Sequence, residues 1–536
     1  MRGVGILKIC GFAVLLGALA TTVQAQTYSV VYNFGDIVLD AVGPQYSGII
    51  AQGRDGNLYT TTPYGGQNGV GAVVKITPTG QETVLYSFNV TDSNEEYPFS
   101  GLTLGIDGNL YGTTSGAQNT NGGKIFRITP AGVLTFLHTF AVGEGFYPFA
   151  PPIQGTDGNL YGTTAFGGTN GCGTLYKLTA SGQFTTIYSF DHANGSFPYA
   201  PLIQGTDGNF YGTAWEGGES GFGTVFRITT QGKVSKLHSF DYYSGAYPYA
   251  PLVQGKDGNL YGTTDQGGDN DYGTIFKVST KGKFTLLHSM SATDGQYPSG
   301  GLVQSIEGNL YGAAYGEPGT IYRITPRGNF SVIHNFDITH GSHPEVTVVQ
   351  HTTGILYGDT FNGGSHGYGT FYSLNANLAP FAALVPTSGK VGRSIGILGQ
   401  GFTGTTAVSF NGTSAQFTVS ADTFLTVTVP DGATTGVVTV TTPGGNLTSK
   451  QLFQVTPVIK SFSPTSGPVG TSVTITGVSL TQTSKVAFGG VVATKFTVNN
   501  DKQVTAIVPT GAKTGKVAVL TPGGTATSPG VFTVTH

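Results

Sequence analysis

The stretch Asp157-Gly-Asn-Leu-Tyr-Gly162 decides the fold, because variants of it recur seven times along the chain. The copy at Asp207–Gly212 carries Phe210, the sixth begins with Glu307, and the seventh, Thr353–Gly358, is degenerate. A stride of about 50 residues between copies predicts a repeat architecture. The aligned tyrosines are Tyr59, Tyr111, Tyr161, Tyr211, Tyr261, Tyr311 and Tyr357.

One repeat, residues 201–240, contains four short segments with the composition of β-strands. The apolar run Pro201–Gln204 precedes Asp207-Gly208, a dipeptide that favours a tight hairpin. Three further strands are expected over residues 209–213, 224–228 and 234–240, and the second of these alternates apolar and polar side chains. Four antiparallel strands without a helix predict the blade of a β-propeller.

The two ends of the repeated region predict how the ring closes. The seventh repeat stops after its third strand, Gly369–Leu374. The N-terminal segment Tyr28–Phe34 has the pattern of a fourth strand and matches Phe184–Phe190 and Phe284–Met290. We therefore predict an all-β, seven-bladed β-propeller whose N-terminal strand closes the last blade and removes the open sheet edges.

A second pair of repeats follows the propeller. Its copies begin with Val385-Pro-Thr-Ser-Gly-Lys-Val-Gly392 and Phe462-Ser-Pro-Thr-Ser-Gly-Pro-Val-Gly470, and the Thr-Pro-Gly-Gly sequence recurs at Thr442 and Thr521. Short alternating strands predict an immunoglobulin-like β-sandwich for each copy. The predicted domains are a propeller over residues 26–378 and sandwiches over residues 379–456 and 457–536.

Both sets of repeats resemble known families. The Gly-x-Leu-Tyr-Gly core, as at Gly108–Gly112, resembles the GloVer tandem repeats of bacterial surface proteins. The blades are also similar to those of virginiamycin B lyase-type propellers, although the His and Glu catalytic pattern of that lyase cannot be placed on this sequence. The C-terminal copies resemble the IPT/TIG domain, which implies spacer or adhesive modules of an extracellular protein.

The N-terminus has the features of an export signal. Arg2 and Lys8 precede the apolar run Phe12–Ala20, and Val23-Gln24-Ala25 is a small-x-small cleavage pattern. We predict a signal peptide over residues 1–25, a secreted, extracellular or cell-surface location, and no transmembrane segment in the mature chain. Outside this leader Cys172 is the only cysteine, so no intrachain disulfide framework is expected.

Composition and motifs exclude several classes of function. Only 10% of the residues are charged, the net charge is −3, and no basic stripe occurs, so nucleic acid is not an expected partner. The sequence contains no nucleophile elbow, phosphate loop, metal-spaced Cys/His set or dinucleotide fingerprint. We predict no catalytic residue, no cofactor and no metal site. The Asp-Gly-Asn turns cap their own backbone, since one carboxylate per turn falls far short of a calcium shell.

Aromatic-Pro-aromatic segments join the fourth strand of one blade to the first strand of the next. They share one end of the ring with the loops between second and third strands, because antiparallel connections alternate ends. Aromatic rings with a polar tip suit sugar rings, and interblade packing is the structural alternative. The candidate ligand-binding residues from these segments are Tyr147, Tyr199, Tyr247 and Tyr249.

The loops between second and third strands contain chemistry that is not repeated. A residue type present in every blade serves the scaffold, whereas one confined to a single loop is a better candidate for a site. Solvated loop acids are the structural alternative. The candidates from these loops are Trp215, the only tryptophan, with Glu216, Asp265, Gln266, Asp269, Asp271, Asp359 and His366.

These features predict a non-catalytic bacterial binding or adhesion protein whose propeller presents loops to a ligand, with polysaccharide as the ligand class. Two alternatives stay open. A propeller-type polysaccharide lyase or glycoside hydrolase would use acids near Glu216, Asp265 and Asp359, and it would need two groups of different pKa in one cleft. A purely structural scaffold would instead bind a cell-envelope protein.

Overall fold

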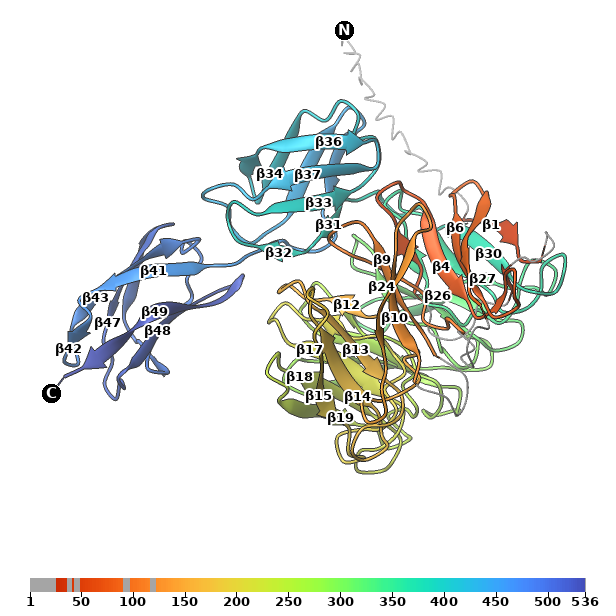
Figure 1. The fold of residues 1–536 in the computed structure, drawn as a ribbon, viewed down its shortest axis with the longest axis horizontal. Helices are drawn as coiled ribbons and strands as arrows, with labels where there is room; N and C mark the ends of the chain where they lie inside the picture. The colour runs from red at the N-terminus through yellow and green to blue at the C-terminus, as the bar shows by residue number, and fades with distance from the viewer. Residues whose placement is uncertain (1–25, 36–40, 43–48, 90–96, 116–121, 536) are drawn as a thin grey trace, which may run out of the picture.

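The computed structural model describes residues 26–35, 41–42, 49–89, 97–115 and 122–535, and the predicted signal peptide lies outside them. Every regular element of these residues is a β-strand, so the all-β prediction is confirmed. A group of four-stranded sheets is followed by two sandwiches in a row (Figure 1). None of the described residues belongs to a helix long and apolar enough to cross a membrane.

Seven sheets of the described repeat region have four antiparallel strands each. The first three sheets are β3 (Ala51–Gln52), β4 (Leu58–Thr62), β6 (Ala72–Ile76) and β7 (Glu82–Ser87); β8 (Thr103–Leu104), β9 (Leu110–Thr114), β10 (Lys124–Ile128) and β11 (Leu134–Thr139); and β12 (Ile153–Gln154), β13 (Leu160–Thr164), β14 (Thr174–Leu178) and β15 (Phe184–Ser189). The next three are β16 (Ile203–Gln204), β17 (Phe210–Ala214), β18 (Thr224–Ile228) and β19 (Val234–Ser239); β20 (Val253–Gln254), β21 (Leu260–Thr264), β22 (Thr274–Val278) and β23 (Phe284–Ser289); and β24 (Val303–Gln304), β25 (Leu310–Ala314), β26 (Thr320–Ile324) and β27 (Phe330–Asn335). The two-residue strands β2 (Ala41–Val42) and β5 (Tyr64–Gly65) pair with each other.

The seventh sheet takes its fourth strand from the N-terminus, as predicted. It consists of β28 (Val349–Gln350), β29 (Leu356–Asp359), β30 (Thr370–Asn375) and β1 (Thr27–Asn33). Thr27 lies opposite Asn375, and Asn33 lies opposite Thr370. The Tyr28 ring stacks on His334 of the preceding sheet at 4.0 Å between centroids, so β1 also packs between blades.

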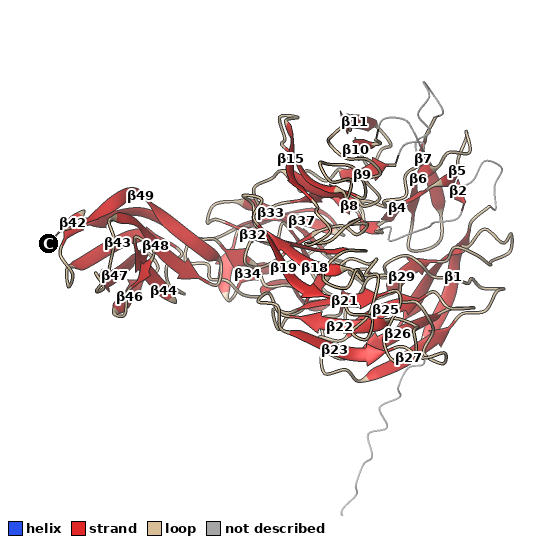
Figure 2. Cartoon of the chain, turned by 90° about the horizontal axis from the view of Figure 1, so that it is seen from below, coloured by secondary structure: helices blue, strands red, loops and turns tan. Residues whose placement is uncertain are grey.

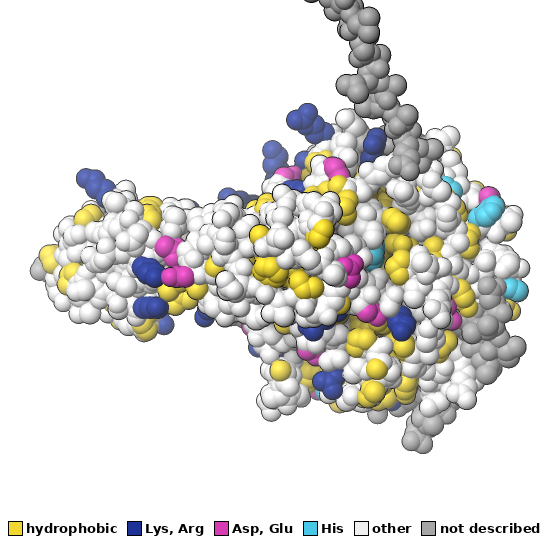
Figure 3. Space-filling model, turned by 90° about the horizontal axis from the view of Figure 1, so that it is seen from above, with side chains coloured by type: hydrophobic (Ala, Val, Ile, Leu, Met, Phe, Trp, Pro, Cys, Tyr) yellow, Lys and Arg dark blue, Asp and Glu magenta, His cyan; other side chains and the backbone are white. Residues whose placement is uncertain are grey.

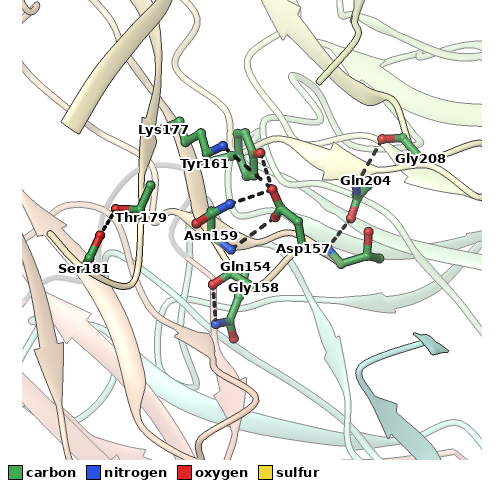
Figure 4. Close-up of polar contacts among 11 residues, drawn as sticks. Gln154, Asp157, Gly158, Asn159, Tyr161, Lys177, Thr179, Ser181, Gln204 and Gly208 are labelled. Atoms are coloured by element: carbon green, nitrogen blue, oxygen red, sulfur yellow. Dashed lines mark hydrogen bonds and ion pairs between the residues drawn. The ribbon is translucent and has the colours of Figure 1, made fainter. Parts of the chain in front are cut away.

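The repeated motif folds into a turn that its aspartate locks (Figure 4). Asp157 Oδ1 accepts the Asn159 N–H at 3.1 Å, and Asp157 Oδ2 accepts Asn159 Nδ2 at 2.6 Å and the Tyr161 hydroxyl at 2.7 Å. Gly158 has a φ of 86°, which glycine adopts without steric cost. The carboxylate is thus used by its own turn. The same three bonds recur at Asp55, Asp107, Asp207 and Asp257.

A glutamine that ends the first strand ties one blade to the blade before it (Figure 4). Gln204 Oε1 accepts the Thr156 N–H at 2.9 Å, and Gln204 Nε2 donates to Gly208 O at 3.0 Å. Gln52 bonds to Thr352 of the seventh blade, so these ties also cross the closure of the ring. The remaining glutamines that make both bonds are Gln154, Gln254 and Gln304.

Aromatic side chains fill the space between neighbouring blades. His138 stacks on Phe184 at 4.0 Å between ring centroids, and His238 stacks on Phe284 at 3.8 Å. A Cβ on Gly212 would lie 2.6 Å from Phe226 Cζ, so the glycine of the motif makes room for the aromatic ring of the third strand. The histidines of the fourth strands therefore pack between blades, as their repeated position predicts.

The first sandwich directly follows the propeller in the sequence. Its sheets are β31 (Ala383–Val385), β33 (Ser394–Leu398), β37 (Phe424–Thr428) and β36 (Phe417–Ala421); β35 (Thr413–Ala415), β34 (Ala407–Phe410), β38 (Val438–Thr442) and β39 (Gly445–Thr448); and the parallel pair β32 (Ser388–Gly389) and β40 (Gln454–Val455). Buried aliphatic residues and three phenylalanines form its core without a disulfide.

The second sandwich extends away from the propeller (Figure 2). Its sheets are β41 (Val458–Ser463), β43 (Ser472–Val478), β47 (Gln503–Ile507) and β46 (Phe496–Asn500); and β42 (Ser466–Gly467), β49 (Gly524–Val534), β48 (Gly515–Thr521), β44 (Lys485–Phe488) and β45 (Val491–Val492). Gln482 bonds to the Thr435 backbone at 2.7 and 3.1 Å, and Lys502 pairs with Asp431 at 2.9 Å, which joins the two sandwiches.

The first sandwich sits on the end of the ring that carries the Asp-Gly-Asn turns, here called the turn end. Thr423 Oγ1 donates to Arg54 O at 2.7 Å, Gln454 Nε2 donates to Thr206 O at 2.8 Å, and the Phe381 N–H donates to Thr352 O at 3.0 Å. The opposite end, here called the loop end, carries the aromatic-Pro segments and the loops between second and third strands. Charged side chains of both signs are dispersed over the face seen in Figure 3, and no broad patch of one sign forms there.

Candidate functional site

The loop end brings together one residue from each successive aromatic-Pro segment. This residue directly follows the proline and lies a few positions before the first strand. The first strands are innermost, because Leu102 N–H donates to Ile49 O at 2.9 Å across the first two blades. The residues at this position, from the second to the seventh blade, are Phe99, Phe149, Tyr199, Tyr249, Ser299 and Glu345.

Four of these residues form a continuous row of rings, here called the aromatic arc. The ring centroids are 5.7 Å apart for Phe99 and Phe149, 5.5 Å for Phe149 and Tyr199, and 5.2 Å for Tyr199 and Tyr249. Each ring is half-buried, so part of it faces solvent. Aromatic pairs at 4.5–7 Å attract one another, and the arc is therefore a preformed apolar surface.

Trp215 extends the arc outward from the loop of the fourth blade. Its ring centroid lies 5.8 Å from Tyr199 and 5.1 Å from Tyr247. Tyr147 packs on Phe149 at 5.7 Å in the same way. The sequence predicts Trp215 and these tyrosines at one end of the ring, and in the structure Trp215 contacts Tyr199 and Tyr247 while Tyr147 contacts Phe149.

The residues that precede the prolines adopt a strained backbone. Tyr147 has a φ of 56° and Tyr247 a φ of 58°, in the left-handed region that residues other than glycine rarely enter. Such a conformation costs on the order of 1–3 kcal/mol and persists where the surroundings hold it. The strain recurs at Phe197, Tyr297 and His343, so it belongs to the repeat and fixes the direction of the rings on the loop end.

The remaining part of the loop end is polar. Ser299 and Glu345 take the places that the arc residues hold in the other blades. Ser299 Oγ donates to Asp265 Oδ1 at 2.9 Å, and burial raises the pKa of the Asp265 carboxyl. We call Asp265, Ser299, Glu345 and Asp359 the acidic sector.

Asp359 is the most deeply buried member of the acidic sector. It replaces a threonine found at the same position of the second strand in most blades, and it is 1% exposed. Neither of its carboxylate oxygens has a hydrogen-bond partner in the described part of the chain. Burial, and then the charge of Glu345, raise the pKa of Asp359 well above its usual range, so the folded protein favours the protonated form of this carboxyl. The threonines are Thr61, Thr113, Thr163, Thr213 and Thr263.

Tyr315 lies within the electrostatic reach of two carboxylates of the acidic sector, Asp265 and Glu345. Its pKa is raised first by burial and then by the charges of Glu345, Asp265 and Glu317. Its ring lies 4.7 Å from His343. Tyr315 occupies the loop position that Trp215 holds in the fourth blade.

The aromatic arc and the acidic sector together are here called the mouth. The other residues singled out from the sequence do not belong to it. Glu216 and Gln266 pair through their backbones with Ser196 and Ala246, as part of short bridges. Asp269, Asp271 and His366 lie on exposed loop tips beside the ends of the fourth strands. The Asp269 N–H donates to Ser289 Oγ at 2.7 Å, and Asp271 accepts the Tyr242 hydroxyl at 2.6 Å.

Glu345, Ser299 and Tyr315 are functional candidates that sequence reasoning missed. The signal was available, because His343-Pro344-Glu345 continues the series of aromatic-Pro segments with the aromatic residues replaced. Among the described residues no cluster of three or more His, Cys, Asp or Glu fits a metal ion. The mouth can therefore offer flat apolar rings, hydroxyls and carboxyl groups to a ligand.

The fold and this mouth define a class: repeat-built β-propellers that carry immunoglobulin-like modules at their C-terminal side. The Gloeobacter/Verrucomicrobia repeat model matches residues 16–155 and 104–319, and the IPT/TIG domain model matches residues 381–456 and 457–534. The chain belongs to the Gloeobacter/Verrucomicrobia repeat family, and it carries two TIG domains. The predicted resemblances to the GloVer repeats and to the IPT/TIG domain are thereby confirmed.

Individual proteins are similar only distantly. A surface glycan-binding protein from Prevotella bryantii is 21% identical over 27% of this chain and 38% of its own, with a TM-score of 0.22. A surface glycan-binding protein from a xyloglucan utilization locus of Bacteroides uniformis is also 21% identical, over 28% of this chain, with a TM-score of 0.15. This chain covers 48% of that second protein, so it spans less than half the length of either.

One similar structure covers more of the propeller. A putative 6-phosphogluconolactonase from Bacteroides uniformis is 14% identical over 56% of this chain and 88% of its own, with a TM-score of 0.39. No match was found among the curated proteins. Similarities this weak do not bear on activity, so the function is argued from the residues of the mouth.

Proposed function

We propose that the loop end binds a polysaccharide and that the protein acts as a binding or adhesion protein outside the cell. The observation that carries the proposal is the meeting of the aromatic arc with the acidic sector at one position of the repeat. Sugar rings present apolar C–H faces that stack on half-exposed aromatic rings. Their hydroxyls donate to carboxylates, and such charge-assisted bonds fix the orientation of a ligand.

The proposal assigns a different role to each part of the mouth. Tyr199, Tyr249 and Trp215 provide the stacking surface, because their rings are contiguous and half-exposed. Glu345 and Ser299 lie beside this surface and bond to hydroxyls. The two TIG modules leave the opposite end of the ring, so they hold the mouth away from whatever the C-terminal side contacts.

A glycan array probed with the full chain tests the proposal, followed by titration of the best ligand. Trp215→Ala should weaken binding at least tenfold, because truncating an aromatic anchor costs about 2 kcal/mol. Tyr243→Ala is the matched control, since Tyr243 is an aromatic residue of the same face that is 80% exposed and outside the arc. Equal binding by both variants, or a folded protein that binds no glycan, would refute the polysaccharide proposal.

Cleavage of the bound glycan is the second candidate function, and the two carboxyls with raised pKa favour it. Burial raises the pKa of both the Asp265 and the Asp359 carboxyl, and a raised pKa favours the protonated form that a general acid requires. Incubation of the full chain with its best-bound polysaccharide, followed by an assay for new reducing ends, tests this. A catalyst would lose turnover in Asp265→Asn, the carboxyl of the pair that is not fully buried, whereas a binding protein would show no product in any variant.

The proposed location rests on the N-terminal segment. Arg2, Lys8 and the apolar run before Ala25 have the features of a cleaved leader. Cell fractionation and N-terminal sequencing of the exported protein test it. A mature N-terminus at Gln26 outside the cytoplasm is expected, and an intact Met1 on a cytoplasmic protein would contradict it.

A further inference from the structure

A cavity of about 310 Å³ lies at the turn end, where the first TIG module meets the propeller. On the propeller side its walls come from the first strands of the first, second and seventh blades, through Gln52, Leu104 and Gln350. On the opposite side its walls come from the TIG module, through Phe381, Leu384 and Lys450. The cavity is therefore an open hollow between the module and the first strands of three blades, and it is lined mainly by apolar side chains.

Gln350 departs from its repeat in this wall. Five other glutamines at the end of a first strand make hydrogen bonds that tie their blade to the ring. Gln350 is 4% exposed, and neither its Oε1 nor its Nε2 has a hydrogen-bond partner within the described chain. A buried amide without a partner costs about 1–3 kcal/mol, so a rotation of the Gln350 side chain toward the cavity would let a ligand pair with it and recover that cost.

Lys450 brings a positive charge to the same cavity. Its Nζ lies 4.9 Å from the centroid of the Phe381 ring, and no ion pair or hydrogen bond of this ammonium occurs among the described residues. The nearest charge that acts on it is another ammonium, that of Lys256. Burial, followed by Lys256, lowers the pKa of Lys450 to about 8. Glu307, the acid of this interface, accepts the Ala379 N–H and faces Lys256.

We propose that this cavity binds a small organic acid, with the Lys450 ammonium holding its carboxylate, the Gln350 amide completing the polar contact and the apolar walls enclosing its body. Charge complementarity selects an anion, because the Lys450 ammonium lines the cavity without an ion pair among the described residues and the charge that acts on it is a second ammonium, that of Lys256. The volume matches roughly ten water molecules, which leaves room for an acid of about the size of phenylbutyrate. The site lies at the opposite end of the ring from the proposed glycan mouth and does not depend on it.

Calorimetric titration of the full chain with 4-phenylbutyrate and octanoate, each beside the corresponding alcohol, tests the proposal. At neutral pH the acid should bind at least tenfold more tightly than its alcohol, since only the acid forms the charge-assisted bond. Binding of the acid should weaken as pH rises through about 8, because Lys450 then loses its proton. An acid and alcohol that bind equally, or an acid whose affinity does not change with pH, would overturn the assignment.

Variants locate the site. Lys450→Met should lower the affinity for the acid at least tenfold and remove its pH dependence, and Leu104→Trp should exclude the ligand by filling the cavity. Lys390→Met is the matched control, since Lys390 is an exposed lysine of the same module. Trp215→Ala should leave the affinity unchanged. Unaltered binding by Lys450→Met, or no binding of any of the probes to the folded wild-type chain, would refute the proposal; the comparison of acid and alcohol stands even where a variant does not fold.

Discussion

The second to fifth blades and the sixth and seventh blades share one backbone but present different chemistry at the loop end. In the former, the residue after each proline is aromatic, and successive rings touch at 5.2–5.7 Å. In the latter the same place holds Ser299 and Glu345, next to Asp265 and Asp359. The strained residue before the proline occurs in both groups, at Tyr247 and at His343. The repeat therefore fixes where a side chain lies, and departures from the repeat decide what it does.

Breaking the aromatic half should have the largest effect. We expect the double variant Phe149→Ala and Tyr199→Ala to lower the affinity for the glycan found on the array about a hundredfold, since it removes adjacent rings from the centre of the arc, a loss of about 3 kcal/mol. Titration of the full chain measures this, with a thermal melt to show that the ring stays folded. Affinity within twofold of wild type would show that the arc is packing and no binding surface.

The second-largest effect is expected from a substitution that makes the seventh blade resemble the others. We expect Asp359→Thr to stabilise the protein by about 2 kcal/mol at neutral pH, because it removes a buried carboxyl without a partner. The substitution should also weaken glycan binding, since it alters the acidic sector. Urea denaturation gives the change in the free energy of unfolding, and Thr263→Ser in the fifth blade is a control that keeps the hydroxyl.

The pH dependence gives this variant a sharper test. The pKa of Asp359 is raised in the folded state, so folding favours the protonated form. That contribution is fully present below about pH 4, where the unfolded carboxyl is also protonated, and it is lost as pH rises. The advantage of Asp359→Thr should therefore grow from acid toward neutral pH. A stability difference that stays constant with pH would contradict the burial of an uncompensated carboxyl.

The turn end offers a matched pair of substitutions that tests the scaffold. Tyr161→Phe removes the hydroxyl that donates to Asp157 Oδ2 at 2.7 Å, and we expect a loss of about 1–1.5 kcal/mol in unfolding free energy. Tyr357 occupies the same place in the seventh blade, where Thr353 stands in the position of the aspartate. Tyr357→Phe should therefore cost far less. Equal losses in urea denaturation would show that the carboxylate adds nothing to the turn.

The smallest effect is expected from a fourth-strand histidine. Burial lowers the pKa of His238 to about 4, so the folded protein keeps it neutral while the unfolded chain takes up a proton at about pH 6.5. Its stabilising contribution is thus present above pH 6.5 and is lost as pH falls toward 4. His238→Tyr copies Tyr188 of the third blade and should remove up to about 1 kcal/mol of this acid loss. The measurement is the urea midpoint of both proteins across this pH range. If the histidine were solvated, the two midpoints would change with pH by the same amount.

Periodicity was enough to predict the architecture of this chain. The Gly-x-Leu-Tyr-Gly copies and the missing strand after Leu374 predict four-stranded sheets and the pairing of β1 with β30, because each follows from local strand patterns and from the absence of a free edge. The position of the first TIG module on the turn end of the propeller could not be predicted from the sequence. It depends on contacts such as Thr423 with Arg54, between residues that no repeat or motif connects.

The site was predicted in part for the same reason. Trp215, Tyr199 and Tyr249 stand out as aromatic residues in loops, and the structure places them in one arc. Asp271 and His366 stand out equally as polar loop residues, yet they lie on outer tips, because a loop of this length returns to the fourth strand. Glu345 escaped notice since its segment begins with His343 and lacks the aromatic residues that mark the others.

The pairing of β1 with β30 also dictates the order in which the chain can fold. Tyr28 precedes all the other blades in the sequence, yet its hydroxyl donates to His340 O, across 312 residues. Closing so long a loop costs entropy that only the completed ladder repays. β1 therefore cannot pair until β30 has been synthesised, and the ring closes only when its seventh blade is complete.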